Sequence, residues 1–181
     1  QSKTEIMRIL EAFGEPISYG GQEAFVMNAL QHIDSSDMTI DLLSPYYCDN
    51  NSTVQKVRER GGEVYALNCR FAPGNIRSSE AAPVRQFLRT HHYDVIHEHS
   101  GSNSMLSMYA RLAHKAGIPR IIVHSHCTGK PGWKHFASKA LTSFSLRRYP
   151  DEYCACSQEA GEWRFPADIC RARLIVINNG I

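Results

Sequence analysis

The sequence lacks the features that mark several large classes of protein. No run of Lys and Arg forms a basic block, and the formal net charge of the 181 residues is only +2, which argues against a nucleic-acid partner. No apolar run is long enough to span a bilayer, and the first residues do not resemble a secretory signal. We therefore expect a cytoplasmic protein, and its length is typical of one domain.

The cysteine spacing and the lack of repeats argue against two further classes of protein, disulfide-stabilised folds and repeat folds. The six cysteines contain no C-x-x-C pair, and several lie within apolar segments, where a reduced thiol behaves as a small hydrophobic side chain. The sequence has no internal repeat and no low-complexity segment. We expect neither a disulfide framework nor a repeat fold.

Short apolar segments alternate with helical patterns along the whole chain. Seven segments have the composition of β-strands, at residues 6–13, 38–44, 63–68, 94–100, 120–127, 152–157 and 174–178. Between them, residues 21–33 and 103–116 place apolar side chains on one helical face. This alternation is typical of right-handed βαβ units. The sequence predicts an α/β, Rossmann-like fold: a mainly parallel sheet of about seven strands in the order 3-2-1-4-5-6-7, flanked by helices.

Two helix boundaries can also be predicted. Ser52 is a plausible N-cap for a helix that ends at Gly61 and Gly62. Gly117, followed closely by a proline, is expected to end the helix before the fifth strand.

Histidines gather at the ends of the fourth and fifth predicted strands. Strand alternation places His97 and His99 on one face and Glu98 on the other, and it places His124 and His126 on one face of the next strand. Ligands of doubly wound sheets bind beyond the carboxyl ends of the strands. The two His-x-His pairs are therefore expected to surround one pocket.

These histidines fit more than one kind of protein. Imidazoles on paired strand ends bind zinc in metal-dependent hydrolases, although the later acids Asp151 and Asp168 lie in no histidine-rich context. Histidines are also often structural, as they would be in a Rossmann-like binding module without chemistry. Both alternatives stay open beside an enzyme that uses the histidines directly.

The first strand is followed by a glycine-containing loop at residues 14–21. Gly20 and Gly21 allow a ligand to approach the backbone, and the free amides of a helix N-terminus favour a phosphate. The alternative is a turn whose glycines serve conformation alone, because the loop does not contain G-x-G-x-x-G. We expect Gly20 to lie at the same edge of the sheet as the four histidines.

Residues 130–149 form an amphipathic pattern with basic flanks, including Trp133 and Lys134. Such a helix usually packs one face in the core, but aromatic and basic residues together also suit an anionic lipid surface.

Five segments, in this order, resemble the N-terminal half of glycosyltransferase family 4, and in particular the bacterial capsular and exopolysaccharide enzymes. They are Tyr19-Gly20-Gly21-Gln22-Glu23, Tyr93-Asp94-Val95-Ile96-His97-Glu98-His99, Arg120-Ile121-Ile122-Val123-His124-Ser125-His126, Cys154-Ala155-Cys156-Ser157 and Val176-Ile177-Asn178-Asn179-Gly180-Ile181.

The resemblance implies a GT-B enzyme, in which two Rossmann-like domains enclose a cleft and transfer a sugar from a nucleotide-sugar donor with retention, without a metal or other cofactor. It implies that Gly20 and Gly21 face the donor diphosphate and that His126 serves the transfer step. His99, His124 and Glu98 would then contact the acceptor, which is a glycan or a lipid-linked sugar.

In that family the main donor-binding residues belong to a second, C-terminal domain. The resemblance implies that residues 1–181 are the acceptor-side domain, that the C-terminal domain is absent from this chain, and that Asn179 and Gly180 lead into it. A fragment of this kind is expected to be inactive alone. Peripheral contact with the inner face of the cell membrane would bring it to a lipid-linked acceptor.

Overall fold

A single parallel sheet organises the protein. The computed structural model describes residues 6–34, 36–72, 79–130 and 132–178, and every structural statement below refers to these ranges. The strands are β1 (Met7–Phe13), β2 (Met38–Ser44), β3 (Val64–Ala66), β4 (Val95–His99), β5 (Arg120–Ser125), β6 (Glu152–Ala155) and β7 (Leu174–Val176). All pairs are parallel, in the order β3-β2-β1-β4-β5-β6-β7. The predicted fold class and strand order are confirmed.

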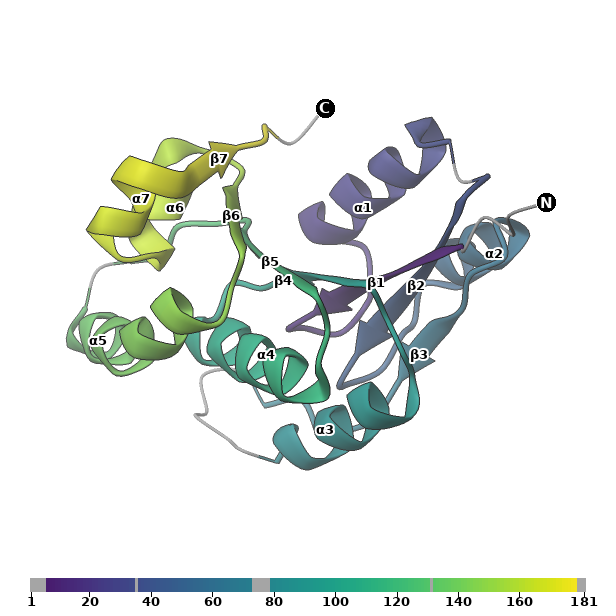
Figure 1. The fold of residues 1–181 in the computed structure, drawn as a ribbon, viewed down its shortest axis with the longest axis horizontal. Helices are drawn as coiled ribbons and strands as arrows, with labels where there is room; N and C mark the ends of the chain where they lie inside the picture. The colour runs from purple at the N-terminus through teal and green to yellow at the C-terminus, as the bar shows by residue number, and fades with distance from the viewer. Residues whose placement is uncertain (1–5, 35, 73–78, 131, 179–181) are drawn as a thin grey trace.

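Helices connect the strands and cover both faces of the sheet (Figure 1). They are α1 (Gly21–His32), α2 (Asn51–Glu59), α3 (Ala81–Thr90), α4 (Asn103–Ala116), α5 (Trp133–Arg148), α6 (Gln158–Arg164) and α7 (Ala167–Arg173). The helices expected at 21–33 and 103–116 are therefore present as α1 and α4, whereas α3, α6 and α7 are additional to the expected ones.

Two apolar cores lie on opposite faces of the sheet. The smaller core joins α1 and α2 to the face that carries Phe13, through residues such as Val26 and Val57. The larger core contains Leu10, Ala12 and buried residues of α3, α4, α5 and α7. Because side chains alternate along a strand, Glu11 points to the same face as Phe13. An acidic residue of the central strand therefore lies on the α1 side of the sheet.

The two predicted helix boundaries differ in outcome. Asn50, not Ser52, is the N-cap of α2, and its side chain accepts a hydrogen bond from Thr53 N at 3.0 Å. Asn50 also donates to Ser18 O at 2.8 Å, a tertiary contact that the local sequence pattern does not reveal. Gly117 ends α4 with a left-handed φ of 80°, as predicted.

The carboxyl ends of β1 and β4 approach each other closely. Gly14 N donates to His99 O at 2.8 Å, and a Cβ atom at Gly14 would lie 2.3 Å from Ser100 Oγ. A glycine is therefore needed at the point where the chain leaves β1. This contact fixes the end of β1 against the histidine-bearing end of β4.

Helix α5 presents most of its large apolar side chains to solvent. Trp133, Phe136, Leu141 and Phe144 are 62–80% exposed, and Leu146 is the one buried residue of the described helix. The usual interpretation of an amphipathic helix, with its apolar face in the core, is therefore wrong here. None of the described helices combines the length and the apolar character needed to cross a bilayer.

Candidate active site: four histidines around Glu11

The candidate site is built on the three central strands, β1, β4 and β5. In the parallel register, Glu11 pairs with His97, Phe13 with His99, and His99 with His124. Alternation directs the imidazoles of β4 and β5 to the face that α1 covers. His126 is the first residue after β5, so the strand ends two residues earlier than the predicted segment 120–127. We refer to His97, His99, His124 and His126 as the histidine cluster.

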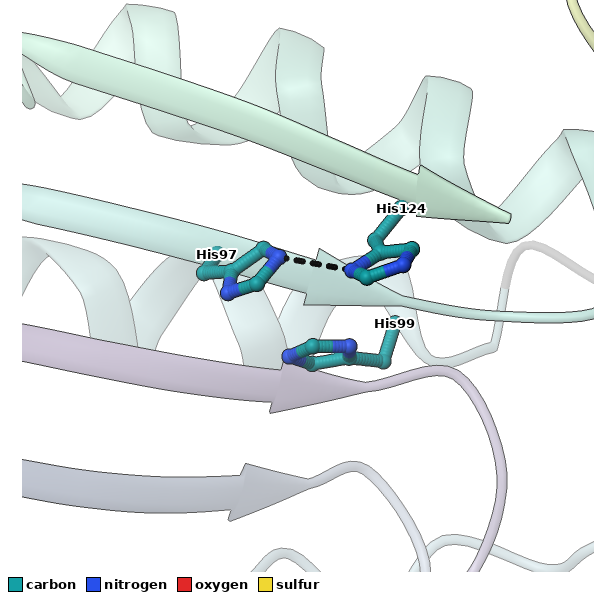
Figure 2. A group of neighbouring side chains, drawn as sticks. All are labelled: His97, His99 and His124. Carbon is teal, nitrogen blue, oxygen red and sulfur yellow. Dashed lines mark hydrogen bonds between the residues drawn. The ribbon is translucent and has the colours of Figure 1, made fainter. Parts of the chain in front are cut away.

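Hydrogen bonds link the cluster to the carboxylate of Glu11 through two relays. Glu11 Oε2 lies 2.5 Å from His99 Nε2 and 3.1 Å from His97 Nδ1. Each of these rings then contacts a histidine of the β5 segment: His99 Nδ1 lies 2.7 Å from His126 Nε2, and His97 Nε2 lies 3.1 Å from His124 Nδ1. Figure 2 shows the latter pair, with the His99 ring beside it. One carboxylate thus anchors four imidazoles.

The relays restrict where protons can lie. Glu11 can only accept, so His97 donates from Nδ1 and His99 donates from Nε2. With all rings neutral, the opposite nitrogens of these two rings must accept, from His124 Nδ1–H and His126 Nε2–H. His124 Nε2 then carries a lone pair, and this atom is buried without a hydrogen-bond partner among the described residues. Glu11 therefore sets the tautomers of the cluster.

Burial and mutual proximity keep His99 and His124 neutral. Burial raises the pKa of the Glu11 carboxyl, but the effects of His97 and His99 outweigh it and hold that pKa well below its usual range. Burial, with the charge of His97, lowers the pKa of His99 to about 4 against the opposing effect of Glu11. Burial, followed by the neighbouring His126, lowers the pKa of His124 well below its usual range. At neutral pH the carboxylate is charged while His99 and His124 are neutral.

An aromatic ring from α1 covers the cluster. Phe25 contacts all four imidazoles, mostly edge-on, with ring centroids 4.9–6.5 Å apart. Phe13 stacks on His99 with ring centroids 5.4 Å apart. Because Phe25 lies just over one turn from the start of α1, the glycine loop and the cluster occupy the same edge of the sheet.

The loop before α1 borders a shallow depression of about 340 Å³, lined by Ser18, Tyr19, Gly20, Glu23, Ala24, Met27, Asn50, Ser52, Thr53 and Lys56. Glu23 Oε1 accepts from Ser18 N at 3.0 Å, which ties the loop to the first turn of α1. A Cβ atom at Gly20 would lie 2.7 Å from Glu23 Oε2, whereas a Cβ atom at Gly21 would meet no atom within 4 Å. The surroundings of residue 21 would therefore accommodate a side chain larger than that of glycine.

Glu98 is separated from the other predicted site residues. Its side chain points to the opposite face of the sheet, with an exposed fraction of 0%. Neither of its carboxyl oxygens has a hydrogen-bond partner among the described residues, and burial raises its pKa well above the usual range. The structure brings the four histidines together, but it does not bring Glu98 to them. Asn179 and Gly180 lie outside the described residues.

Sequence reasoning missed two acidic residues. Glu11 is a lone carboxylate between apolar residues of a central strand, and this position is the signal that could have identified it. Glu15 Oε1 accepts from Ser100 Oγ at 2.9 Å and from Gly101 N at 3.1 Å, and so connects the glycine loop to the segment after β4. Burial raises the pKa of Glu15.

The cluster has the composition of a metal site as well as that of a polar binding pocket. Nitrogen atoms of His97, His99 and His124 all lie within 4.8 Å of one another. His99 and His124 have an exposed fraction of 0%, while His97 and His126 are partly exposed and border the solvent.

Comparisons with known proteins agree with this architecture. Solved structures with the same fold include Anabaena Alr3699/HepE in complex with UDP (18% identity, TM-score 0.64, 97% of this chain and 44% of that chain). They also include a glycosyltransferase from Rickettsia africae (13%, 0.60, 97% and 44%) and the UDP-GlcNAc 2-epimerase from Neisseria meningitidis bound to UDP-GlcNAc (17%, 0.56, 96% and 46%). The chain thus spans less than half the length of these proteins. No curated protein matches the sequence. The family described as "glycosyl transferase 4-like domain" matches residues 20–180, nearly the whole chain, and the protein therefore belongs to this family.

Proposed function

We propose that this domain is the acceptor-side half of a retaining glycosyltransferase that moves a sugar from a nucleotide-sugar donor to a glycan or lipid-linked acceptor. The observation that carries the proposal is the family match over residues 20–180. Additional support comes from HepE, whose UDP-bound structure this chain matches over 44% of the HepE length. A second domain would complete the cleft, and the sequence resemblance suggests capsular or exopolysaccharide synthesis as the pathway.

The proposed site uses the glycine loop for the donor and the histidine cluster for the transferred sugar and acceptor. Gly20 and Gly21 leave the N-terminus of α1 open to a diphosphate. His126, at the rim of the cluster, would hydrogen-bond the donor sugar or stabilise charge as the glycosidic bond breaks. His99 and His124 would hold the His126 ring and shape the acceptor side. Because Glu98 is buried on the opposite face, the proposal leaves it out.

The proposed transfer needs no metal or other cofactor, because the cluster already supplies neutral imidazoles whose tautomers Glu11 fixes. The test uses full-length enzyme, UDP-glucose and UDP-N-acetylglucosamine as donors, and a lipid extract as acceptor, with and without EDTA. Transfer that persists in EDTA supports the proposal. Loss of transfer with EDTA and recovery with zinc would favour a metal-dependent reaction.

The isolated domain is proposed to be inactive, because half of a two-domain cleft cannot hold donor and acceptor in reacting geometry. Transfer by the 181-residue chain alone would contradict this part of the proposal.

We also propose that α5 contacts anionic lipid, which would bring the domain to a lipid-linked acceptor at the inner face of the cell membrane. Trp133, Phe136 and Phe144 are exposed on one side of the helix, and Lys134 and Arg148 lie at its two ends. Two other basic residues of α5 serve internal contacts instead: Lys139 donates to Glu162 O, and Arg147 pairs with Asp168 at 2.8 Å. The remaining aromatic and basic groups have the chemistry of an interfacial helix.

Vesicle flotation tests this contact. We expect the full-length enzyme to float with vesicles that contain phosphatidylglycerol and not with neutral vesicles, and the double variant Trp133→Ser with Phe144→Ser to lose the effect. Equal recovery with both vesicle types would contradict the lipid contact and favour a protein surface as the occupant of this face.

A further inference from the structure

The geometry points to a zinc-binding site in the histidine cluster, with His97, His99 and His124 as ligands and Glu11 as the carboxylate that orients two of them. We propose that the folded domain binds one Zn²⁺ there. This inference concerns zinc binding to the domain alone and does not rest on the proposed transferase activity; because the ion would occupy nitrogens that hold the His126 ring, the zinc-bound domain is not the form proposed to transfer sugar.

Nitrogens of the cluster already face one another at suitable distances. His97 Nε2 and His124 Nδ1 are 3.1 Å apart, and nitrogens of these two rings and of His99 all lie within 4.8 Å of one another. Two imidazole nitrogens bound to one tetrahedral zinc ion at about 2.0–2.1 Å lie about 3.3 Å apart. The separation of the His97 and His124 nitrogens is therefore within a few tenths of an ångström of that in a zinc site, whereas the His99 nitrogen would have to move closer by up to about 1.5 Å.

Glu11 prepares the ligands in the way that metal sites require. A metal-bound histidine usually donates its other ring N–H to a carboxylate, which fixes the tautomer and the ring orientation. Glu11 Oε2 accepts from His97 Nδ1 and His99 Nε2, so the lone pairs of these rings lie on His97 Nε2 and His99 Nδ1, where an ion would replace the hydrogen bonds from His124 and His126. The carboxylate also contributes one negative charge beside the site. Ring contacts with Phe13 and Phe25 hold the imidazoles in place before any ion binds.

His124 can adopt the tautomer that the site needs. Its Nδ1 faces His97, and its Nε2 is buried with no hydrogen-bond partner among the described residues. In the metal-free site the contact with His97 Nε2 places the proton on His124 Nδ1. An ion that replaces this contact would leave the proton on Nε2, where no described neighbour opposes it, while Nδ1 binds the ion. Partly exposed His97 gives the ion a route from solvent.

The donor set selects the kind of metal. Neutral imidazoles suit Zn²⁺, Cu²⁺, Ni²⁺ and Co²⁺, whereas Mg²⁺ and Ca²⁺ prefer oxygen ligands. The candidate ligand group among the described residues consists of histidines alone, without a cysteine. A site of this composition is expected to bind zinc and to ignore magnesium.

The test is a titration of the metal-depleted 181-residue chain with ZnCl2, followed by calorimetry and elemental analysis, with MgCl2 as a parallel probe. We expect one zinc ion per chain and a rise in melting temperature, because a ligand that binds only the folded state stabilises it. Glu11→Gln should weaken zinc binding about 10–100-fold, the usual loss when an orienting carboxylate is removed. His97→Ala removes a ligand and should abolish the stoichiometric site.

The matched control is His32→Ala, because His32 is an exposed histidine at the end of α1. It should bind zinc like the wild type. Far-UV circular dichroism confirms that each variant is folded, and His97→Ala is the variant least expected to unfold because its side chain reaches solvent. Cobalt is the spectroscopic probe: the cluster should give tetrahedral cobalt absorption without thiolate charge transfer. Absence of a stoichiometric site, binding unchanged by both Glu11→Gln and His97→Ala, or a thiolate signature would each overturn the inference.

Discussion

Replacing Glu11 tests whether one carboxylate holds the histidine cluster together. Glu11 Oε2 accepts two hydrogen bonds from buried or partly buried imidazoles, at 2.5 and 3.1 Å. Hydrogen bonds to a charged group contribute about 1.5–3 kcal/mol each, and neutral ones contribute roughly half as much. Glu11→Gln keeps the size and one accepting oxygen but removes the charge and introduces an amide donor, so it should lower the free energy of unfolding by about 2 kcal/mol. Glu11→Leu leaves both donors without an acceptor and should cost about 4 kcal/mol.

Urea unfolding of the metal-free chain at pH 7, followed by circular dichroism, measures both losses. Long-range proton–nitrogen NMR spectra provide a second readout, because they report which ring nitrogen carries the proton. In the wild type we expect protons on Nδ1 of His97 and on Nε2 of His99. An unfolding free energy of Glu11→Leu equal to or above that of the wild type would refute the anchoring role, as would the opposite tautomers in the wild type.

Three further predictions follow from the glycine loop and the helix packing. Burial raises the pKa of Glu15 in the folded state, so ionisation of Glu15 is expected to destabilise the protein as pH rises from the unfolded-state pKa, about 4.3, through the folded-state pKa. Glu15→Gln should flatten this pH dependence of the unfolding free energy. A pH dependence identical to that of the wild type would contradict the reasoning. Gly21→Ala should have an unfolding free energy equal to that of the wild type or up to about 1 kcal/mol higher, because alanine favours a helix and its Cβ would meet no atom within 4 Å. If Gly21 serves the donor diphosphate, the full-length variant should nevertheless show a raised KM for the donor. An unchanged KM would leave Gly21 only a conformational role. Gly62→Ala should destabilise the domain by about 2 kcal/mol or more, because the new Cβ would lie 2.0 Å from Ile40 O. A melting temperature equal to that of the wild type would show that this close approach is not present in solution.

Much of the fold could be predicted because it depends on local periodicity. Alternation of apolar strands with helices determines a parallel sheet, and strand alternation alone places His97 and His99 on one face and Glu98 on the other. The order of strands then brings β4 next to β5, so the histidines meet at one edge. The prediction that Glu98 contacts the acceptor rests on the family resemblance and is at odds with strand alternation, which directs Glu98 to the opposite face.

The missed features depend on contacts between distant segments. Glu11 is a single acidic residue in an apolar strand, and its importance appears only when β1 lies beside β4. Phe25 looks like an ordinary core residue of α1, yet it packs on four imidazoles. Asn50 replaces Ser52 as the N-cap because it also donates to Ser18 O, a contact across 32 residues. The exposure of the aromatic residues of α5 likewise reflects where neighbouring helices pack, which periodicity alone does not determine.

The most direct test of the proposed function is the rate of sugar transfer by full-length enzyme that carries His126→Ala. His126 lies at the rim of the cluster, one residue beyond β5, and it is linked through His99 to the anchoring carboxylate. Loss of a positioned polar group at a reaction centre typically lowers the rate about 100-fold or more. We predict a loss of that size in kcat with little change in unfolding free energy, and wild-type transfer by the control His32→Ala. Near-normal turnover by His126→Ala together with a large loss in His124→Ala would move the role to His124, and full activity in both variants would contradict a catalytic role for the histidine cluster.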